Sequence, residues 1–452
     1  SKVRCVDRCI GRASLELFFL NCPRWFLRLL SAQEIICAIQ LFIYALSLQK
    51  YIVRSNKRFI SMQTRYNAEQ NELRLELRDY FKKLMTPDVV AEVLGHEGGS
   101  VFRDVIKKLG SDGILTLGWP EEFGGKNYTA VEQLILFEEA WSAHTPFPLV
   151  TINTVGPALQ KFGSQEQKAF FLPKIAAGEC IFAVGYTEPG SGTDLASLST
   201  PAVKDGDDYI INGTKVYTSS GHDCEYIWMA ARTSKGERRP SDGITMFIVD
   251  TNDPGYSTTP IYTVGDIETN ISYYENIRVT PDRILGEVGK GWSIITAQLN
   301  HERVALAAMT VIGNKQFKRV VRRMREMTTE KGGPLASPVT RAKIGELYSR
   351  LETMEILNLR TALQTEKGQL NVALASGAKV TNILALIEVL RECLELVDED
   401  ALVKHGSPDA IFTGDLERDY RNGQISTVGG GVLEVMRCMV ASFGLGMPNT
   451  IA

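Results

Sequence analysis

The periodicity of apolar residues changes twice along this chain of 452 residues. Leu73, Leu77 and Leu84 recur at the spacing of an amphipathic helix, and the pattern stays helical to about residue 180. Residues 181–290 instead contain short β-rich runs separated by glycine turns. From residue 291 onward, long amphipathic stretches with few glycines return. The sequence therefore predicts an α+β protein in which a β domain separates two helical domains.

The same pattern predicts the individual elements. Asp205-Gly206 and Asn212-Gly213 have the composition of two-residue hairpin turns and flank a predicted strand at 209–211. Further strands are predicted at 226–231 and 244–249. Helices are predicted at 101–109, 130–141 and 165–175 before the β domain, and at about 295–329, 338–365, 369–403 and 412–441 after it.

Composition excludes two classes of function. Hydrophobic residues make up 44% of the chain and charged residues 23%, which is ordinary for a soluble globular protein. The net charge of −3 provides no electrostatic footprint for nucleic acid. The five histidines are scattered, and no Cys or His pair is matched by a second pair at zinc-site spacing, so no metal site is predicted.

Residues 1–61 differ in composition from the rest of the chain. They contain ten Lys or Arg, three acidic residues and four of the eight cysteines. The apolar run at 35–48 is too short to cross a bilayer, which takes about 20 residues. Three interpretations stay open: an Arg-rich targeting peptide, an interfacial membrane anchor, or an extension translated upstream of a start at Met62. We favour an appendage outside the main fold over an anchor.

The most informative local motif is the loop 185–194, GYTEPGSGTD, which follows a short apolar run at 181–184. Gly190 and Gly192 have no Cβ, so a ligand can approach the backbone N–H groups closely. The spacing is not the G-x-G-x-x-G of a Rossmann βαβ unit, which excludes a nicotinamide site of that type. We therefore expect this loop to hold a ligand with anionic groups.

Five motifs, taken in chain order, resemble those of the acyl-CoA dehydrogenase family. The loop 185–194 is similar to the family's flavin-binding signature, with Tyr186 where an aliphatic residue is more usual. The resemblance runs from about Tyr66 to the C-terminus, and motifs in the right order are far more specific than any one of them. The other four motifs are 118–125 (GWPEEFGG), 174–179 (KIAAGE), 212–219 (NGTKVYTS) and 286–292 (GEVGKGW).

This resemblance implies a fold, a cofactor and a location. The implied domains are an N-terminal α-helical domain at 62–180, a central β-barrel at 181–290 and a C-terminal four-helix bundle at 291–452. The implied cofactor is FAD, whose ring would be hydrogen-bonded by Thr187 and Ser219 and stacked by Tyr217. The location would be the cytoplasm of a bacterium or the mitochondrial matrix of a eukaryote. The complete set of expected cofactor-binding residues is Tyr186, Thr187, Gly192, Thr193, Tyr217, Thr218 and Ser219.

Glu302 is the candidate catalytic base. It interrupts an apolar stripe that includes Ile295 and Leu306, and a carboxylate on a buried face is costly unless it is paired or its pKa is raised. The residues alone leave open a structural ion pair with Arg303. The resemblance favours the base, because the isovaleryl and long-chain branches of the family have it in an E-R pair at this place. Arg303 is then the candidate partner of CoA or of nearby carboxylates.

Other branches of the family have the base near the C-terminus, where this chain has a glycine. Aligning Arg437 with the arginine of that motif puts Gly430 at the position of the base, and glycine has no carboxylate. The segment 427–432, TVGGGV, can offer backbone amides to a substrate or can simply connect two helices. The resemblance implies that an N–H near Gly430, with a flavin hydroxyl, binds the thioester oxygen of an acyl-CoA substrate.

Two replaced segments bear on the quaternary structure. Family homo-oligomers clamp a neighbour's flavin with R-x-x-F-G and Q-x-x-G-G segments, where this chain has 328–334 (TTEKGGP) and 396–400 (LVDED). Acidic residues repel a pyrophosphate, although a solvated helix end is the ordinary explanation of an acidic triplet. The pattern resembles the heteromeric acyl-CoA dehydrogenases of actinobacterial steroid side-chain degradation, which implies a homologous partner subunit in an α2β2 assembly, with a homo-oligomer as the open alternative.

The expected activity is the FAD-dependent conversion of an acyl-CoA to a trans-2-enoyl-CoA, with electrons passing to an acceptor of the electron-transfer flavoprotein type. Two alternatives stay open. The first is a non-catalytic partner or scaffold subunit, which the eroded clamp favours and the intact loop 185–194 and Glu302 disfavour. The second is an acyl-CoA oxidase, which the short chain after the β domain disfavours.

Overall fold

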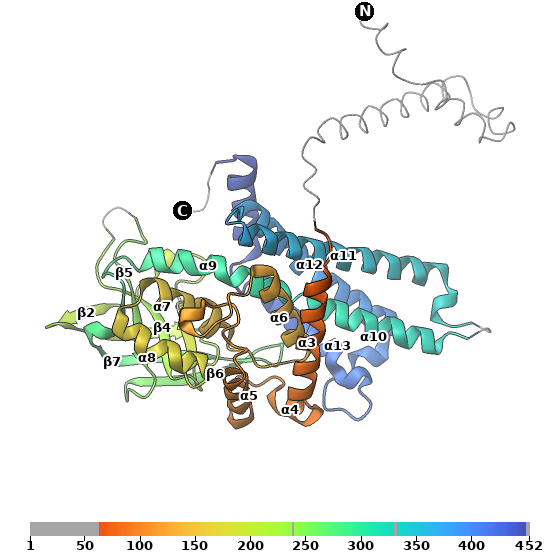
Figure 1. The fold of residues 1–452 in the computed structure, drawn as a ribbon, viewed down its shortest axis with the longest axis horizontal. Helices are drawn as coiled ribbons and strands as arrows, with labels where there is room; N and C mark the ends of the chain where they lie inside the picture. The colour runs from red at the N-terminus through yellow and green to blue at the C-terminus, as the bar shows by residue number, and fades with distance from the viewer. Residues whose placement is uncertain (1–62, 237–238, 330–331, 449–452) are drawn as a thin grey trace, which may run out of the picture. The chain divides into compact units, whose positions relative to one another are not determined.

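The computed structural model of the chain describes residues 63–236, 239–329 and 332–448 (Figure 1). Along one helix, the backbone is described at 299–304 and 306 but the side chains are not. The predictions made for residues 1–61 fall outside the described residues. The described chain has the α+β fold that the sequence predicts.

The first helical region contains the four helices predicted before the β domain, including the one predicted from the apolar repeat of Leu73, Leu77 and Leu84. Three of its helices begin with a capping box, in which the Asn67, Thr129 or Ser164 side chain accepts from a backbone N–H that would otherwise lack a partner. A turn of π-helix at Val150–Val155 was not predicted. The helices are α3 (Ala68–Leu84), α4 (Pro87–Val93), α5 (Ser100–Ser111), α6 (Ala130–Ser142), α7 (Gly156–Phe162) and α8 (Gln165–Ala176).

The β region consists of two four-stranded sheets. The strand orders are β1-β4-β5-β8 and β2-β3-β7-β6, and all pairs are antiparallel except β1 with β4. One apolar core runs from the first helices into this region, where Trp228 is fully buried. The strands are β1 (Phe182–Gly185), β2 (Ala202–Asp205), β3 (Asp208–Val216), β4 (Tyr226–Arg232), β5 (Ile244–Asp250), β6 (Tyr256–Tyr262), β7 (Glu268–Val279) and β8 (Ile284–Leu285).

One of the two predicted hairpin turns is confirmed and the other is wrong. Gly206, at φ 64°, lies in the turn that joins β2 to β3. Asn212-Gly213 instead lies inside β3, where the pairing with β7 shifts register in a β-bulge. An added Cβ at Gly213 would come within 2.8 Å of the Thr200 side chain, so this glycine permits a close approach rather than a turn.

The last region is the helical bundle, and two of its predicted helices are divided. The stretch 295–329 breaks between α9 and α10, because the Thr310 hydroxyl bonds to Ala307 O and the backbone there forms i→i−3 hydrogen bonds. The stretch 412–441 breaks at 428–432, where Gly430 and Gly431 have positive φ. The helices are α9 (Gly291–Ala308), α10 (Val311–Met327), α11 (Pro338–Glu366), α12 (Val372–Val397), α13 (Asp415–Gly423) and α14 (Leu433–Met439).

Helix α9 connects the sheets to the bundle. It packs against β5 at one end and against α6 and α11 further along, so it passes from the strands to the helical part of the molecule (Figure 1). Among the described residues, α12 alone is long and apolar enough by composition to cross a membrane. It packs against α10, α11, α13 and α14, as a core helix of a bundle does.

Candidate functional site

The predicted cofactor loop begins where β1 ends, at Gly185. Its conformation is held by Glu188, whose carboxylate accepts from the backbone N–H groups of Ser199 and Thr200. At Gly190 an added Cβ would meet no atom within 4 Å, and at Gly192 it would meet only a Thr187 methyl at 3.7 Å. The outer side of the loop is therefore open to the backbone approach of a ligand.

Lys215 forms a buried ion pair with Glu188 beneath this loop. Its Nζ lies 2.8 Å from Glu188 Oε1 and 3.1 Å from Tyr186 O, and its side chain is fully buried. Burial by itself would raise the pKa of Glu188, but the Lys215 ammonium and the hydrogen bonds from Thr200 and Ser199 outweigh it and lower the pKa to about 2. The pair therefore keeps Glu188 ionised and ties the loop to β3.

Tyr186 connects the same loop to helix α9. Its hydroxyl donates to Gln298 Oε1 at 2.6 Å and accepts from Trp228 Nε1 at 3.1 Å. Gln298 is buried, and its Nε2 has no hydrogen-bond partner among the described residues. The Tyr186 hydroxyl therefore links the loop after β1 to helix α9 through Gln298.

The second predicted cofactor segment follows β3. Tyr217 has a φ of 60° and its ring is 65% exposed, so an aromatic face is held outward on a backbone that favours glycine. Thr218 is fully buried, and its hydroxyl shares a hydrogen bond with Ser272. The Ser219 hydroxyl donates to Thr269 Oγ1 at 3.2 Å. The Tyr217 ring is therefore accessible to a ligand, whereas the buried Thr218 hydroxyl forms a hydrogen bond within the sheet.

The predicted site residues come from three separate parts of the fold. Thr187, Gly192 and Thr193 lie on the loop after β1, and Thr193 is exposed. Glu302 and Arg303 belong to α9, where the structure describes their backbone but not their side chains. Gly430, with φ 66°, lies in the turn before α14.

The two segments predicted to lack a flavin clamp are described in part. Thr329 and Gly332 pair with each other in an antiparallel β-bridge after α10. Asp398 ends α12 with a φ of 73°, and Asp400 lies 3.6 Å from Arg323 of α10. One of the three acids therefore has a basic partner within the chain, as at an ordinary solvated helix end.

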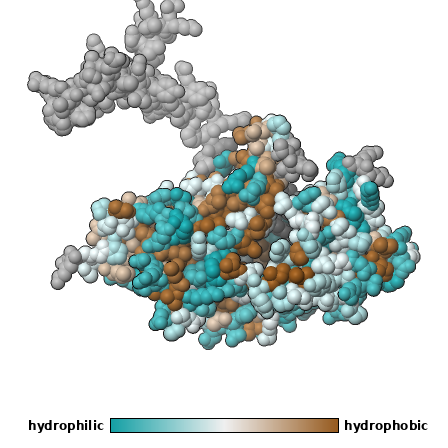
Figure 2. Space-filling model, turned by 180° about the vertical axis from the view of Figure 1, so that it is seen from behind, coloured by the Kyte–Doolittle hydropathy of each residue, from teal (hydrophilic) through white to brown (hydrophobic). Residues whose placement is uncertain are grey.

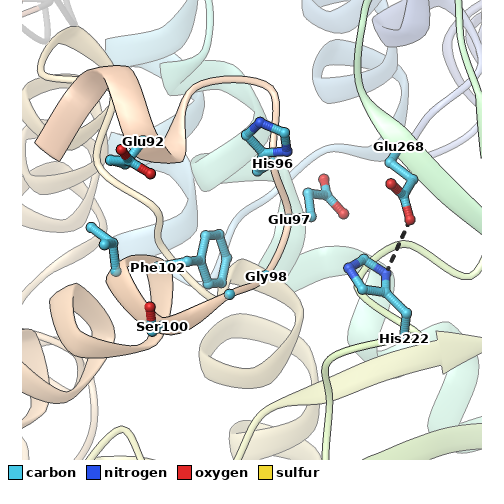
Figure 3. Close-up of a pocket in the computed structure, with 10 residues that line it drawn as sticks. Glu92, His96, Glu97, Gly98, Ser100, Phe102, His222 and Glu268 are labelled. Atoms are coloured by element: carbon cyan, nitrogen blue, oxygen red, sulfur yellow. Dashed lines mark ion pairs between the residues drawn. The ribbon is translucent and has the colours of Figure 1, made fainter. Parts of the chain in front are cut away.

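A pocket of about 370 Å³ lies elsewhere, between the α4–α5 loop and the β region. Figure 3 shows His96 and Glu97 on that loop, opposite the His222–Glu268 ion pair. Burial raises the pKa of Glu97 to about 7, although the Ser220 hydroxyl, at 3.2 Å, opposes the shift. None of the predicted cofactor or catalytic residues lines this pocket.

Metal binding has no support in the described part of the chain. Among these residues, no three His, Cys, Asp or Glu side chains are grouped to hold an ion. The Glu188 carboxylate beneath the predicted cofactor loop is paired with Lys215.

Sequence models of the acyl-CoA dehydrogenase N-terminal, middle and C-terminal domains match residues 67–179, 183–275 and 289–445. The chain belongs to the acyl-CoA dehydrogenase family, whose members are FAD-dependent oxidoreductases. It is 40% identical to acyl-CoA dehydrogenase FadE26 of Mycobacterium tuberculosis over 401 residues, which cover 86% of this chain and 99% of the relative.

Two solved structures whose names each join two proteins share this fold. The Tcur3481-Tcur3483 steroid acyl-CoA dehydrogenase has a TM-score of 0.82 and 42% identity, over 86% of this chain and all of that one. The ChsE4-ChsE5 complex from Mycobacterium tuberculosis has a TM-score of 0.81 and 38% identity over the same shares. The relatives with known structures therefore include the heteromeric steroid type that the sequence predicts.

Two residues of the site were not among the sequence-based candidates. Lys215 lies within the motif 212–219. A charged residue in a β-rich run was the sequence signal that could have indicated its buried ion pair. Gln298 has no motif of its own, and only its position four residues before Glu302 could have drawn attention to it. The site fits FAD, since the loop after β1 is open at two glycines and Tyr217, which follows the Val216 N–H that donates to Thr187 O, presents an exposed ring.

Proposed function

We propose that this chain dehydrogenates an acyl-CoA thioester between Cα and Cβ, with Glu302 as the base that removes the α-proton. The observation that carries the proposal is the 2.6 Å hydrogen bond between Tyr186 and Gln298, because it joins the cofactor loop to α9. Residue 302 follows Gln298 by four positions, about one helical turn. This arrangement favours a base near the loop that is expected to hold the flavin ring.

The reaction removes one proton and one hydride from the substrate. Glu302 takes the α-proton as the Cα–H bond breaks, and a trans double bond forms between Cα and Cβ to give the 2-enoyl-CoA. FAD, when bound, accepts the hydride from Cβ. Arg303 would meet CoA or neighbouring carboxylates, and the N–H of Gly430 would bind the thioester oxygen. A carboxylate abstracts so weak an acid only when its own pKa is raised and the forming enolate is stabilised.

The proposed base is tested by Glu302→Gln, which keeps the size of the side chain and removes the carboxylate. We expect anaerobic reduction of the flavin by acyl-CoA to slow by about 10²-fold to 10⁴-fold or more, with flavin content unchanged. Reduction at the wild-type rate would return Glu302 to a structural role beside Arg303. Reoxidation of the reduced flavin in air, compared with reoxidation by an electron-transfer flavoprotein, separates dehydrogenase from oxidase.

We further propose that the active assembly is heteromeric, with a homologous partner supplying the cationic clamp for the flavin pyrophosphate. The Tcur3481-Tcur3483 structure and the ChsE4-ChsE5 complex support this proposal. The chain also exposes large apolar side chains on α12 and after α14, as a subunit does at an interface. They are Leu374, Leu384, Phe443, Leu445 and Met447. Figure 2 shows that apolar side chains gather in patches on the face turned away from the viewer of Figure 1.

A further inference from the structure

Lys379 reaches from α12 to the glycine turn before α14. Its Nζ donates to Gly429 O at 2.5 Å and to Gly431 O at 2.7 Å. Fifty residues of chain separate the lysine from the first of these carbonyls. A side-chain ammonium has three N–H donors, so it can bind two carbonyls at once, whereas a Met side chain of similar length has no donor.

The two carbonyls determine where the neighbouring N–H groups point. The peptide bonds are trans, so each N–H points opposite to the C=O of the same peptide. Because the carbonyls of Gly429 and Gly431 turn toward Lys379, the N–H groups of Gly430 and Val432 turn away from it. Among the described residues, neither N–H has a hydrogen-bond acceptor. The N–H groups of Gly430 and Val432 therefore point away from Lys379, on the opposite side of the turn.

The turn does not hold this conformation by itself. Gly430 and Gly431 have φ values of 66° and 100°, in a region that glycine enters readily and leaves readily. Val428 and Gly429 are anchored to Ile425 O, and Met436 N donates to Val432 O. Among the described residues, the side chain that hydrogen-bonds to the turn between these anchors is that of Lys379.

We propose that Lys379 is a positioning residue, which orients the Gly430 N–H, with that of Val432 beside it, toward the thioester oxygen of the substrate. This inference rests on the proposed function, because it needs an enolate to stabilise. The ammonium also polarises both peptides, and so strengthens the donors opposite to it. Lys379 would not touch the substrate but would act through the backbone of the turn.

The first test measures the turn itself. Lys379→Met keeps the length of the side chain and removes its charge and donors, Lys379→Arg keeps a cation, and Lys367→Met is the matched control at an exposed lysine. We expect hydrogen–deuterium exchange to be faster over 425–436 in Lys379→Met only. Exchange equal to that of wild type would overturn the inference, because the lysine would then not order the turn.

The second test measures the oxyanion donors without turnover. The full chain, with its partner subunit where one is needed to load the flavin, is titrated with acetoacetyl-CoA, whose α-protons ionise without reducing the flavin. The ultraviolet absorbance reports the enolate. We expect the ionisation constant of the bound probe to fall by up to about a hundredfold in Lys379→Met, since loss of an oxyanion donor itself costs about 10²-fold to 10³-fold and this variant misplaces the donor without removing it. Its binding should change by less than about threefold, a split that marks a lost transition-state-type interaction.

The pattern across the variants decides the inference. Lys379→Arg should recover most of the ionisation, and Lys367→Met should equal wild type. An ionisation constant in Lys379→Met equal to that of wild type overturns the proposal. The proposed function is judged separately, by wild-type flavin reduction and by Glu302→Gln. The exchange measurement needs no turnover, so the two proposals can fail independently.

Discussion

Lys215 and Glu188 form an ion pair of 2.8 Å in which 0% and 7% of the two residues are exposed. One partner comes from β3 and the other from the loop after β1, so the pair ties the two predicted cofactor segments together. Removing one partner of a buried pair leaves an uncompensated charge, which is far more costly than removing both. The stability of the protein and the shape of its cofactor loop therefore depend on the same contact.

Lys215→Met is expected to lower the free energy of unfolding by about 3–5 kcal/mol, because the Glu188 carboxylate is left buried without its partner. FAD content should fall with it. Denaturant unfolding of the apoprotein measures the first effect and absorbance at the flavin band the second. Lys204→Met, at an exposed position on β2, is the matched control and should change stability by less than about 0.5 kcal/mol. A loss below about 1 kcal/mol for Lys215→Met would show that the pair contributes little.

Glu188 should also make the fold sensitive to acid. Its pKa is lowered from 4.5 to about 2, so its contribution is present above the unfolded pKa and is lost as the pH falls toward 2. Glu188→Gln lacks this term. The difference in unfolding free energy between wild type and Glu188→Gln should therefore shrink by up to about 3 kcal/mol over this window. Urea unfolding at a series of pH values from 6 downward measures it, and two parallel curves would contradict the assignment.

Tyr217 should show opposite effects on cofactor binding and on the stability of the apoprotein. Tyr217→Gly removes the ring and relieves the positive φ, which costs a non-glycine residue about 1–2 kcal/mol, so after the entropy cost of glycine the apoprotein should gain about 0.5–1 kcal/mol while FAD affinity falls roughly tenfold. Flavin titration and thermal unfolding provide the two measurements. Tyr262→Gly, at another exposed tyrosine, tests whether any ring loss has this effect. If FAD binds Tyr217→Gly as tightly as wild type, the ring does not stack on the flavin.

The heteromer proposal predicts a stoichiometry. Expressed alone, this chain should bind FAD poorly, because Asp398, Glu399 and Asp400 cannot neutralise a neighbour's pyrophosphate. Co-expressed with a homologous partner, it should form an α2β2 assembly with about one FAD per heterodimer, since one surface of each pair lacks a clamp. Native mass spectrometry and flavin absorbance measure both quantities. A stable homotetramer with one FAD per subunit would end the proposal.

The sequence by itself determined the class of fold and marked the loop 185–194 as the expected cofactor site. Hydrophobic periodicity is a local signal, so the change from helices to strands and back was readable, and the glycine turn at Gly206 was predicted for the same reason. The second such turn was wrong because Asn212-Gly213 pairs with β7, and pairing between distant strands overrides a local turn preference. The motif 185–194 was similarly local and did not need coordinates.

Only the tertiary structure decided which distant residues act together. The hydrogen bond from Tyr186 to Gln298 spans 112 positions, and that from Lys379 to Gly431 spans 52. Neither has a sequence spacing that indicates contact, because the separation depends on how whole helices and strands pack. Burial is decided in the same way: Thr218 and Tyr217 are neighbours in the chain, yet one is fully buried and the other 65% exposed. The sequence determines which chemical groups a side chain carries, but the fold determines which residues those groups contact.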